Sequence, residues 1–492
     1  MPEQAGVNIA HPDKLHIGGK WVSPAEGGTI DIVNPNSESV VATVAAAGNS
    51  DMDAAAAAAR EAFETGPWPN MSPKERGTYL RAMADWLEGR AGELGAAWTA
   101  QIGALPKIAP MIVGEGVNGL RGSAELAETF EFERRAQSPV AECAMIVREP
   151  VGVVAAITPW NAPFPIMCNK IGPALAAGCT VVMKPSPETP MEAYLIMEAA
   201  EAAGLPPGVL NLVPSERDAA DHLVNNPNID KVAFTGSTVA GRRIATVCGD
   251  RMARYTLELG GKSAAIVLDD FPTEIAAKIL ANTITVFSGQ VCAMLSRAIV
   301  PKSRHDEMAE AIASEMQTIK VGYSDAEDTM MGPLAMKRQL ERVEGYIEKG
   351  QAEGAELVQG GHRPSHLNHG YFMEPTLFAN VDNRSTIAQE EIFGPVLSLI
   401  PADDLDDAIR IANESQYGLS GAVMTNNPDE AYRVSRRVRT GVIGQNGMRA
   451  DFNLPFGGFK LSGVGREGGA EGMMAYLETK TVLLDGAPSH LQ

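Results

Sequence analysis

Residues 150–184 read PVGVVAAITPWNAPFPIMCNKIGPALAAGCTVVMK, and they alternate two kinds of segment. The runs PVGVVAAIT and CTVVMKP are almost continuously apolar and rich in Val, which is typical of parallel strands covered on both faces. A helical segment that ends in PALAAG lies between them, and a second helix is expected to begin at Thr189 and Pro190. This pattern predicts a doubly wound α/β domain.

The alternation continues along the chain. VLNLVP, KVAFTG and YTLELGG are the next expected strands, and STVAGRRIATV is an expected helix between the last two. A second α/β set begins at SAAIVLDD, with a helix in TEIAAKILANTITVF and a strand near SRAIVP. We therefore place a domain change near Gly260 and Gly261. Two helices are expected ahead of the first set: an Ala-rich helix from Ser50 to about Phe63, and a helix around KERGTYLRAMADWLEGR. Both are expected to pack against the rest of the fold and to have no chemical role.

Bulk composition narrows the class of protein. A chain of 492 residues with 45% hydrophobic and 21% charged residues is expected to fold into two or more domains. The net charge of -20 is spread along the chain, which argues against a nucleic-acid partner. No apolar run reaches the roughly 18 residues of a membrane span. The opening MPEQAGVNIAHPDK lacks the features of a signal peptide, so a cytoplasmic location is expected. The five cysteines have no metal-ligand spacing, so we expect reduced thiols and no metal site.

Two motifs are excluded by their context. Gly463–Gly468 spells GxGxxG, but no strand precedes it and no βαβ unit follows, so we expect a loop. Gly261-Lys262-Ser263 resembles the end of a P-loop, but Thr256 stands where the first glycine should be. Neither motif supports dinucleotide binding or phosphoryl transfer.

The segment FTGSTVAG, residues 234–241, has a more suitable context. An expected strand leads into Gly236 and Ser237 and then into a helix, which places free N–H groups and a hydroxyl at a helix N-terminus. This is the form of a phosphate site, although an ordinary capped turn remains the alternative.

Three further side chains are candidates for chemistry. Asn161 follows the first strand, where its amide can donate to an oxyanion or merely cap a helix. Cys292, in SGQVCA, has small neighbours that admit a substrate, although free cysteines are more often buried apolar residues. Glu258 lies among leucines, where a carboxylate is costly unless it has a function or faces water at the strand end.

In chain order, TPWN, VVMKP, FTGST, LELGGK, GQVC, EEIFGP and PFGGFKLSG together resemble the aldehyde dehydrogenase superfamily, in its hydrolytic, non-acylating NAD(P)-dependent branch. The similarity runs from HIGGKWV to the final strand and includes the 34-residue interval from Glu258 to Cys292. It implies oxidation of a small-molecule aldehyde to the carboxylic acid, with Cys292 as nucleophile. Asn161 and the Cys292 N–H would form the oxyanion hole, and Glu258 would activate the hydrolytic water.

The resemblance also implies NAD as cofactor, with NADP possible. It assigns cofactor contacts to the following residues: Thr158, Trp160, Lys184, Gly236, Ser237, Leu259, Glu391 and Phe393. Two departures from the family pattern lie near the adenosine ribose and the dinucleotide. Pro187, followed by Glu188, replaces a common Glu or Ser, and Ser215 replaces a usual glycine.

The implied fold is α/β, with a doubly wound Rossmann-type cofactor domain, an α/β catalytic domain and an oligomerisation β-hairpin. The cofactor domain would comprise residues 1–127 and 151–260, and the catalytic domain residues 261–460. Residues 128–150 and 461–492 would form bridging segments, with a hairpin near 130–150 that supports a homodimer or homotetramer.

Three alternative functions differ in chemistry. A relative that transfers the acyl group to coenzyme A generally lacks the glutamate found at Glu258. A non-redox Cys-dependent hydrolase would need a histidine base, and the eight histidines avoid the motif segments. A silent binding protein would not be expected to keep Cys292, Glu258 and Asn161.

Side-chain size suggests the substrate class. Ala162, Asn169 and Val286 are modest side chains at positions expected to line the substrate tunnel. We therefore expect aromatic, terpenoid or longer aliphatic aldehydes to be preferred over acetaldehyde. The alternative is that aromatic neighbours refill the space; the candidates are Phe164, Phe452 and Phe456.

Overall fold

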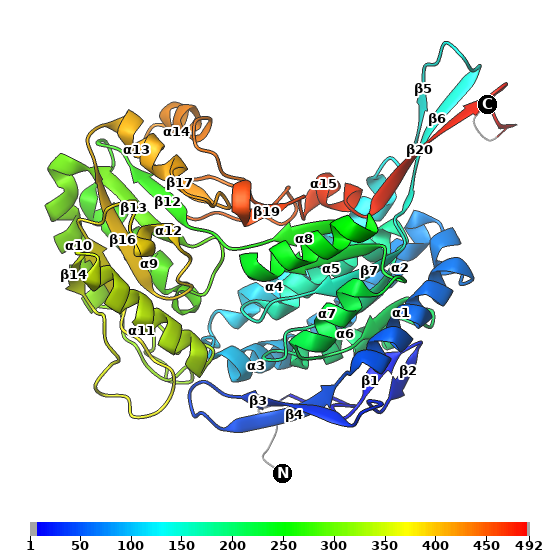
Figure 1. Ribbon diagram of the computed structural model, residues 1–492, viewed down its shortest axis with the longest axis horizontal. Helices are drawn as coiled ribbons and strands as arrows, with labels where there is room; N and C mark the ends of the chain where they lie inside the picture. Colours follow the sequence, from blue (N-terminus) through cyan, green and yellow to red (C-terminus); the bar gives the residue numbers. More distant parts are fainter. Residues whose placement is uncertain (1–6, 490–492) are drawn as a thin grey trace.

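The computed structural model describes residues 7–489 and confirms the predicted α/β class (Figure 1). Its two large sheets each carry helices on both faces, and a three-stranded sheet projects from the body. Within the described part of the chain, no helix is both long and apolar enough to cross a bilayer.

The first large sheet has eight strands in the order β19-β11-β10-β7-β8-β9-β1-β2. Its parallel centre consists of β11 (Arg254–Glu258), β10 (Lys231–Thr235), β7 (Val153–Ile157), β8 (Thr180–Lys184) and β9 (Leu210–Leu212). Its antiparallel edges are β19 (Gly463–Val464), β1 (Leu15–Ile17) and β2 (Lys20–Val22). The predicted strands VVAAI, TVVMK, KVAFT and YTLE are therefore neighbours in space.

Alternation along β7 explains how this sheet is covered. Val154 and Ala156 belong to the hydrophobic core on one face, while Val153, Ala155 and Ile157 belong to the core on the other. The first face is covered by α2 (Pro73–Gly89), α3 (Ala91–Ile102), α4 (Ala109–Thr129), α5 (Pro163–Ala177) and α6 (Met191–Ala202). The second face is covered by α1 (Asn49–Glu64), α7 (Arg217–Asn225) and α8 (Thr238–Arg251). Both strand faces are buried, as the continuous apolar runs predict.

The predicted N-terminal helices are confirmed. The Ala-rich helix α1 buries Ala55, Ala56, Ala59 and Ala62 against the sheet, so its alanines provide close packing. Helix α2 begins with a capping box, in which the Ser72 hydroxyl accepts from the Glu75 N–H and the Glu75 carboxylate accepts from the Ser72 N–H. The 3-10 turn η1 (Trp68–Asn70) connects the two helices.

The second large sheet has seven strands in the order β14-β15-β16-β13-β12-β17-β18. They are β14 (Glu356–Gln359), β15 (Thr376–Ala379), β16 (Val396–Ala402), β13 (Leu295–Pro301), β12 (Ser263–Val267), β17 (Gly421–Met424) and β18 (Gly444–Gln445). Only β14 pairs antiparallel to its neighbour. Gly260 and Gly261 lie between β11 of the first sheet and β12 of the second.

Helices also cover both faces of this sheet. One face carries α9 (Thr273–Thr285), the turns η2 (Val286–Gly289) and η3 (Lys302–Arg304), and α10 (His305–Gln317). The other face carries α11 (Lys337–Ala352), α12 (Thr386–Gln389), α13 (Leu405–Asn413) and α14 (Pro428–Ser435).

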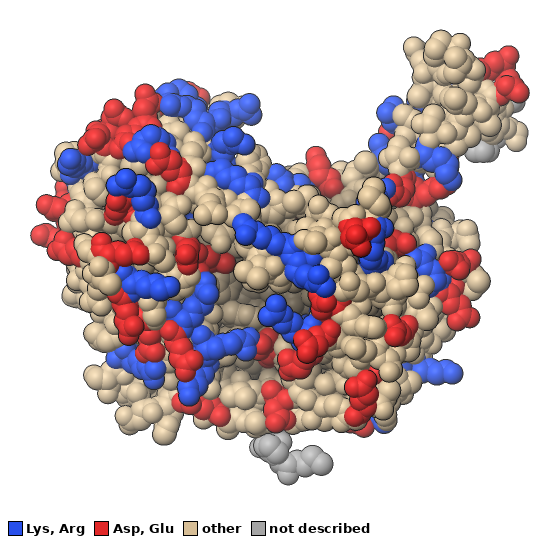
Figure 2. Space-filling model, in the orientation of Figure 1, with Lys and Arg blue, Asp and Glu red and all other residues tan. Residues whose placement is uncertain are grey.

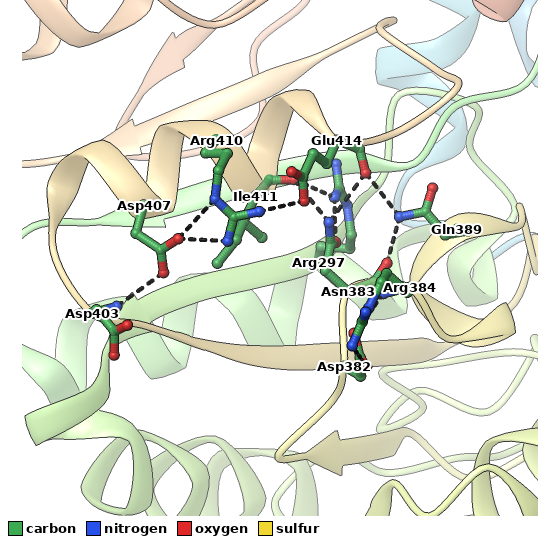
Figure 3. A network of polar contacts seen from close by, with 10 residues as sticks. All are labelled: Arg297, Asp382, Asn383, Arg384, Gln389, Asp403, Asp407, Arg410, Ile411 and Glu414. Carbon is green, nitrogen blue, oxygen red and sulfur yellow. Dashed lines mark hydrogen bonds and ion pairs between the residues drawn. The ribbon is translucent and has the colours of Figure 1, made fainter.

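We call the eight-stranded sheet with its helices the first unit and the seven-stranded sheet with its helices the second unit. A buried arginine connects several segments at the centre of the second unit by hydrogen bonds (Figure 3). Arg297 on β13 is only 1% exposed. Its guanidinium donates to Asn383 Oδ1 at 2.9 Å and to the carbonyl of Ile411 at 3.0 Å. It also donates to the carbonyl of Ala412 at 3.0 Å. Its Nε donates to the carbonyl of Lys262 at 3.0 Å. The turn after Gly260 and Gly261 is therefore anchored in the core of the second unit.

The projecting sheet consists of β5 (Glu133–Ala136), β6 (Cys143–Pro150) and β20 (Leu477–Leu484), in the order β20-β6-β5 (Figure 1). A hairpin of β3 (Gly28–Val33) and β4 (Val40–Ala46) forms a separate small sheet. The C-terminal elements η4 (Lys460–Ser462) and α15 (Gly469–Met474) precede β20.

The GxGxxG segment differs in one respect from the expected loop. Gly463 and Val464 form β19, which pairs antiparallel with Leu257 and Glu258 at the edge of the first sheet. A short pairing of this kind needs no apolar run, so composition does not reveal it. The segment still lacks the strand–helix context of a dinucleotide motif.

Candidate active site

A cavity of about 440 Å³ opens where the carboxyl ends of β7, β10 and β11 face the second unit. It brings together eight of the predicted site residues: Trp160, Asn161, Gly236, Ser237, Leu259, Cys292, Glu391 and Phe393. Figure 2 shows this side of the molecule hollowed between its two halves, with charged side chains around the hollow. The predicted Glu258, Thr158 and Lys184 do not line the cavity.

Cys292 follows a strained turn that is firmly held. Phe287 and Ser288 have φ values of 49° and 55°, in the left-handed region that side chains usually avoid. The Ser288 hydroxyl donates to the carbonyls of Gly332 and Pro333, at 2.8 and 3.1 Å. These contacts pin the segment that presents Cys292 to the cavity.

The Cys292 thiol is chemically distinct from the other cysteines. Cys292 is partly exposed, while Cys143, Cys168, Cys179 and Cys248 are buried. Burial of the sulfur, together with the charges of Glu391 and Glu258, raises the pKa of Cys292 to about 12. The resting group is therefore a thiol, and its attack on a carbonyl requires a proton acceptor.

Asn161 is fixed by hydrogen bonds on both sides. Its side-chain Nδ2 donates to the Gln290 carbonyl at 2.9 Å, and its own carbonyl accepts from the Trp98 indole at 3.1 Å. One amide N–H is used by Gln290, and the second is available to a substrate oxygen. Ala162, not Asn161, is the N-cap of α5, so the helix-cap alternative does not apply.

Glu258 ends β11 and is 3% exposed. Neither of its carboxylate oxygens has a hydrogen-bond partner among residues 7–489. Burial, followed by the charge of Glu467, raises the pKa of Glu258 well above its usual value, and Lys170 and Arg466 act in the opposite direction. A Cβ on Gly457 would lie 2.6 Å from Glu258 Oε1, so the glycine leaves room for this carboxyl group.

Sequence reasoning missed a buried ion pair beside Glu258. The Lys170 ammonium on α5 donates to the carboxylate of Glu467, and both side chains are almost fully buried. The two residues are 297 positions apart, so no local pattern links them. The available signal was Lys170 itself, the one charged side chain of the largely apolar helix α5. Glu467 belongs to the GxGxxG segment that was set aside.

The start of α8 provides a cradle for an anion. Ser237 is the N-cap, and its hydroxyl accepts from the Ala240 N–H at 3.3 Å. A Cβ on Gly236 would lie 2.6 Å from the Phe234 ring, and one on Gly241 would lie 2.5 Å from Leu259. Only glycines allow these close approaches, and the exposed N–H groups of the helix start suit the pyrophosphate of a dinucleotide.

The opposite wall is formed by the EEIFGP segment. Phe393 has a left-handed φ of 63° and packs edge-to-face on Trp160, with ring centroids 5.2 Å apart. Glu391 Oε1 accepts from the Gly261 N–H at 3.0 Å, and Arg342 of α11 donates to the Glu391 carbonyl at 2.5 Å. Burial raises the pKa of Glu391 to about 7. This wall therefore presents a carboxyl group that can accept hydrogen bonds from ribose hydroxyls.

Thr158 and Lys184 lie deeper along the sheet edge. The Thr158 N–H donates to the Lys184 carbonyl at 3.2 Å, in register with the pairing of Ile157 and Lys184. Lys184 is 6% exposed, and burial lowers its pKa to about 8, against the charges of Glu188 and Glu216. Ser215, the predicted departure from glycine, is fully buried.

The substrate side of Cys292 is apolar. Cys292 packs with a small cluster of Val291, Ala293, Met448, Phe452 and Phe456. Asn169 and Phe452 line a cavity of about 290 Å³, whereas Val286 lines a separate one of about 300 Å³. Phe164 is buried in the core of the first unit. Two of the three aromatic residues considered as fillers therefore belong to this cluster: Phe456 is part of its buried centre, and Phe452, like Cys292, packs against it.

Among the described residues, no histidine lines the Cys292 cavity, and His490 lies outside them. A thiol–imidazole pair is therefore absent from this cavity, which counts against a Cys-dependent hydrolase.

Comparisons with known proteins agree with this geometry. Residues 21–482 match the model of the "Aldehyde dehydrogenase family". The geranial dehydrogenase of Castellaniella defragrans is 45% identical, over 96% of this chain and 98% of that protein. The crystal structure of a Mycobacterium tuberculosis aldehyde dehydrogenase complexed with NAD+ is 42% identical, with a TM-score of 0.94, over 97% of this chain and 99% of that one. A mutant of aldehyde dehydrogenase C from Pseudomonas syringae, complexed with NAD+ and octanal, is 38% identical, with a TM-score of 0.94, over 98% and 99%.

Proposed function

Because this chain belongs to the aldehyde dehydrogenase family, we propose that Cys292, Asn161 and Glu258 carry out its NAD-dependent oxidation of an aldehyde to a carboxylic acid. The observation that carries this assignment is their arrangement. Cys292 and Asn161 line one cavity, and the buried, unpartnered carboxyl group of Glu258 contributes to the electrostatic field at the Cys292 sulfur.

Cys292 begins the reaction. Its sulfur bonds to the aldehyde carbon as its proton is released to solvent water. The carbonyl oxygen becomes an oxyanion, which the second Asn161 N–H and the Cys292 backbone N–H stabilise. Bound NAD+ supplies the acceptor for the hydride that leaves this carbon. Cys292 then holds the acyl group as a thioester.

Glu258 completes the turnover. Its carboxylate takes a proton from a water molecule, whose oxygen attacks the thioester carbon. The C–S bond breaks, the acid leaves, and the Cys292 thiolate takes back the proton held by Glu258, which restores both the thiol and the carboxylate. Ser237 and Gly236 would hold the pyrophosphate with Trp160 near it, Glu391 and Phe393 would contact the nicotinamide ribose, and Lys184 would lie near the adenosine ribose. Thr158 and Leu259 would be further cofactor contacts.

The test is an aldehyde panel followed by NADH absorbance, repeated with coenzyme A in the buffer. We expect NADH together with a free acid, and no thioester of coenzyme A. Formation of that thioester would assign the chain to the acylating branch, and no NADH with any aldehyde would overturn the proposal.

We further propose that the preferred substrates are bulky apolar aldehydes. Phe452 and Phe456 occupy part of the space near Cys292, but the cluster is apolar throughout, so each substrate methylene buried against it contributes up to about 0.8 kcal/mol. Two relatives are consistent with it, one named for geranial and one crystallised with octanal. Side-by-side kcat/KM values for acetaldehyde, hexanal, geranial and a substituted benzaldehyde test the preference. Acetaldehyde as the best substrate would refute it.

We also propose that cofactor binding and catalysis are carried out by different parts of the chain. Residues 1–127 and 151–260 would bind the cofactor, and residues 261–460 would carry Cys292 and the substrate. This agrees with the two large sheets, although residues 1–6 and 490–492 lie outside the described part.

Residues 128–150 and 461–492 would support a homodimer or homotetramer. Within the chain, the outer edges of β5 and β20 pair with no described strand, and exposed edges favour pairing with another copy. Light scattering of the full chain and of an Arg134→Pro variant tests this, since proline in β5 removes a backbone donor. A monomeric wild type would overturn it.

We also propose a cytoplasmic location, which the five free cysteines support.

A further inference from the structure

An ion pair joins the two units beside the cofactor cavity. Arg338, the second residue of α11, lines the cavity, and its guanidinium donates to Glu188 Oε1. Glu188 belongs to the loop between β8 and α6 in the first unit. The pair therefore connects the second unit to the loop that follows Lys184.

Both oxygens of the Glu188 carboxylate have partners. The Ser186 hydroxyl donates to Oε2, and Arg338 donates to Oε1. Burial opposes ionisation, but these two donors outweigh it and hold the pKa of Glu188 below its usual value. Glu188 is therefore a fixed negative charge with 22% of its side chain exposed.

Glu188 also acts on a second cation. The field at the buried Lys184 ammonium contains two opposing carboxylates, Glu188 and Glu216. Two cations, Lys184 and Arg338, are thus faced by two carboxylates, and this group of four has no formal net charge.

The position of this group relative to the cofactor rests on the proposed function. With the nicotinamide beside Cys292 and the pyrophosphate at Ser237, the adenosine half continues along the carboxyl ends of the next strands. The strand order β10-β7-β8 leads from Ser237 to Lys184 and the following loop. The adenosine ribose therefore approaches the Glu188–Arg338 pair.

We infer that Glu188 determines cofactor specificity in this enzyme by holding Arg338, so that the site accepts NAD and rejects NADP. A carboxylate can accept a hydrogen bond from a ribose hydroxyl, whereas a 2′-phosphate needs a free Arg or Lys. Of the two cations here, Arg338 is already bound to Glu188, and the buried Lys184 ammonium is balanced by the carboxylates of Glu188 and Glu216, so neither is free for a phosphate. Glu188 thus supplies, one position after Pro187, a carboxylate that Pro187 itself does not carry.

Variants of Glu188 and Arg338 should differ in NADP binding. Glu188→Gln keeps the size and a hydrogen-bonding group but removes the charge, and it releases Arg338 to a 2′-phosphate. The gain in NADP binding should therefore depend on Arg338. Removing Arg338 as well should cancel the gain, because no freed guanidinium remains.

The test measures dissociation constants for NAD+ and NADP+ by titration calorimetry, together with kcat/KM for both on one aldehyde. We expect Glu188→Gln to move the ratio of the NADP+ and NAD+ constants at least about tenfold towards NADP+. The double variant Glu188→Gln/Arg338→Gln should return to within about threefold of wild type. The matched control is Glu344→Gln, which breaks the ion pair between Glu344 of the same helix α11 and Arg363 in a later loop, and it should leave the ratio unchanged.

An unchanged ratio in Glu188→Gln overturns the inference, as does an equal gain in the double variant. Either result leaves the proposed function intact if the wild type still binds NAD+ and forms NADH. A wild type that binds neither nucleotide overturns the proposed function itself. Each glutamate is replaced by a glutamine of similar size and Arg338 is 65% exposed, so all of these variants are expected to fold, which circular dichroism checks.

Discussion

The Asn161 side-chain amide donates to the Gln290 carbonyl at 2.9 Å, two residues before Cys292 in the chain. The group proposed to stabilise the oxyanion is thus held by the same segment that carries the nucleophile. Any shift of the Cys292 loop moves both together, which preserves their relative geometry.

Asn161→Ala should lower kcat/KM by about 10²–10³, the usual cost of one lost oxyanion donor. The Kd for NAD+ should change little, because the α8 cradle is intact. Steady-state kinetics and calorimetry measure the two effects. Asn225→Ala, at an exposed asparagine on α7, is the control. A rate within threefold of wild type would remove Asn161 from the chemistry.

Cys292→Ala should abolish aldehyde oxidation while nucleotide binding persists. The sulfur forms the covalent bond, whereas Ser237 and Glu391 provide the cofactor contacts. NADH absorbance and a calorimetric titration with NAD+ check the two halves separately. Measurable turnover by the purified variant would contradict a mechanism in which Cys292 forms a covalent bond to the substrate.

Glu258→Gln should produce one equivalent of NADH per active site in a rapid burst and then stall. Loss of the base should slow the steady rate by about 10²–10⁴, because thioester hydrolysis requires proton transfer from water. Stopped-flow absorbance records both phases, with Glu274→Gln on the exposed side of α9 as control. A normal steady rate would mean that Glu258 serves the structure.

The raised pKa of Glu258 predicts the pH dependence. Only the carboxylate form can act as base, so the steady rate should rise with pH as Glu258 deprotonates. Glu467→Gln removes a like charge that raises this pKa, so the rising limb should move to lower pH. Lys170→Met removes a favourable cation and should move it to higher pH. Profiles of kcat from pH 5 to 9 decide this, and no movement in either variant would contradict it.

The buried Lys170–Glu467 pair predicts an effect on stability. Lys170→Met leaves a buried carboxylate unpaired, which should cost about 3–5 kcal/mol of unfolding free energy. Lys170→Met/Glu467→Leu should recover most of that loss, because no buried charge remains. Denaturant unfolding compares them with Arg243→Met, which breaks an exposed pair and should cost no more than about 1 kcal/mol. Equal losses in the two single variants would contradict the assignment.

The strands of the two large sheets could be predicted from apolar runs in the sequence. Each run from VVAAI to SAAIV is a strand of one of the two large sheets, because burial on both faces leaves a pattern readable from the sequence alone. The edge strand β19 has no such pattern, since two residues paired at an edge need no apolar side chains.

The site was predictable only in part, because sequence motifs are local and several of its contacts are not. Eight predicted residues meet in one cavity, but the pairing of Lys170 with Glu467 joins positions 297 residues apart. Arg338 near a helix start resembles any solvated arginine. Its relation to Glu188 depends on how the two units face each other, which no local stretch encodes.

The pairing of β19 with β11 has a consequence for synthesis of the chain. β11 is complete at Glu258, but its outer edge stays open until Gly463 and Val464 leave the ribosome, about 200 residues later. At 5–20 residues per second, the outer edge of β11 stays unpaired for roughly 10–40 s. During that interval the growing polypeptide exposes an unpaired strand edge, to which chaperones could bind. The last tenth of translation supplies β19, which covers this edge, and Glu467, which pairs with Lys170.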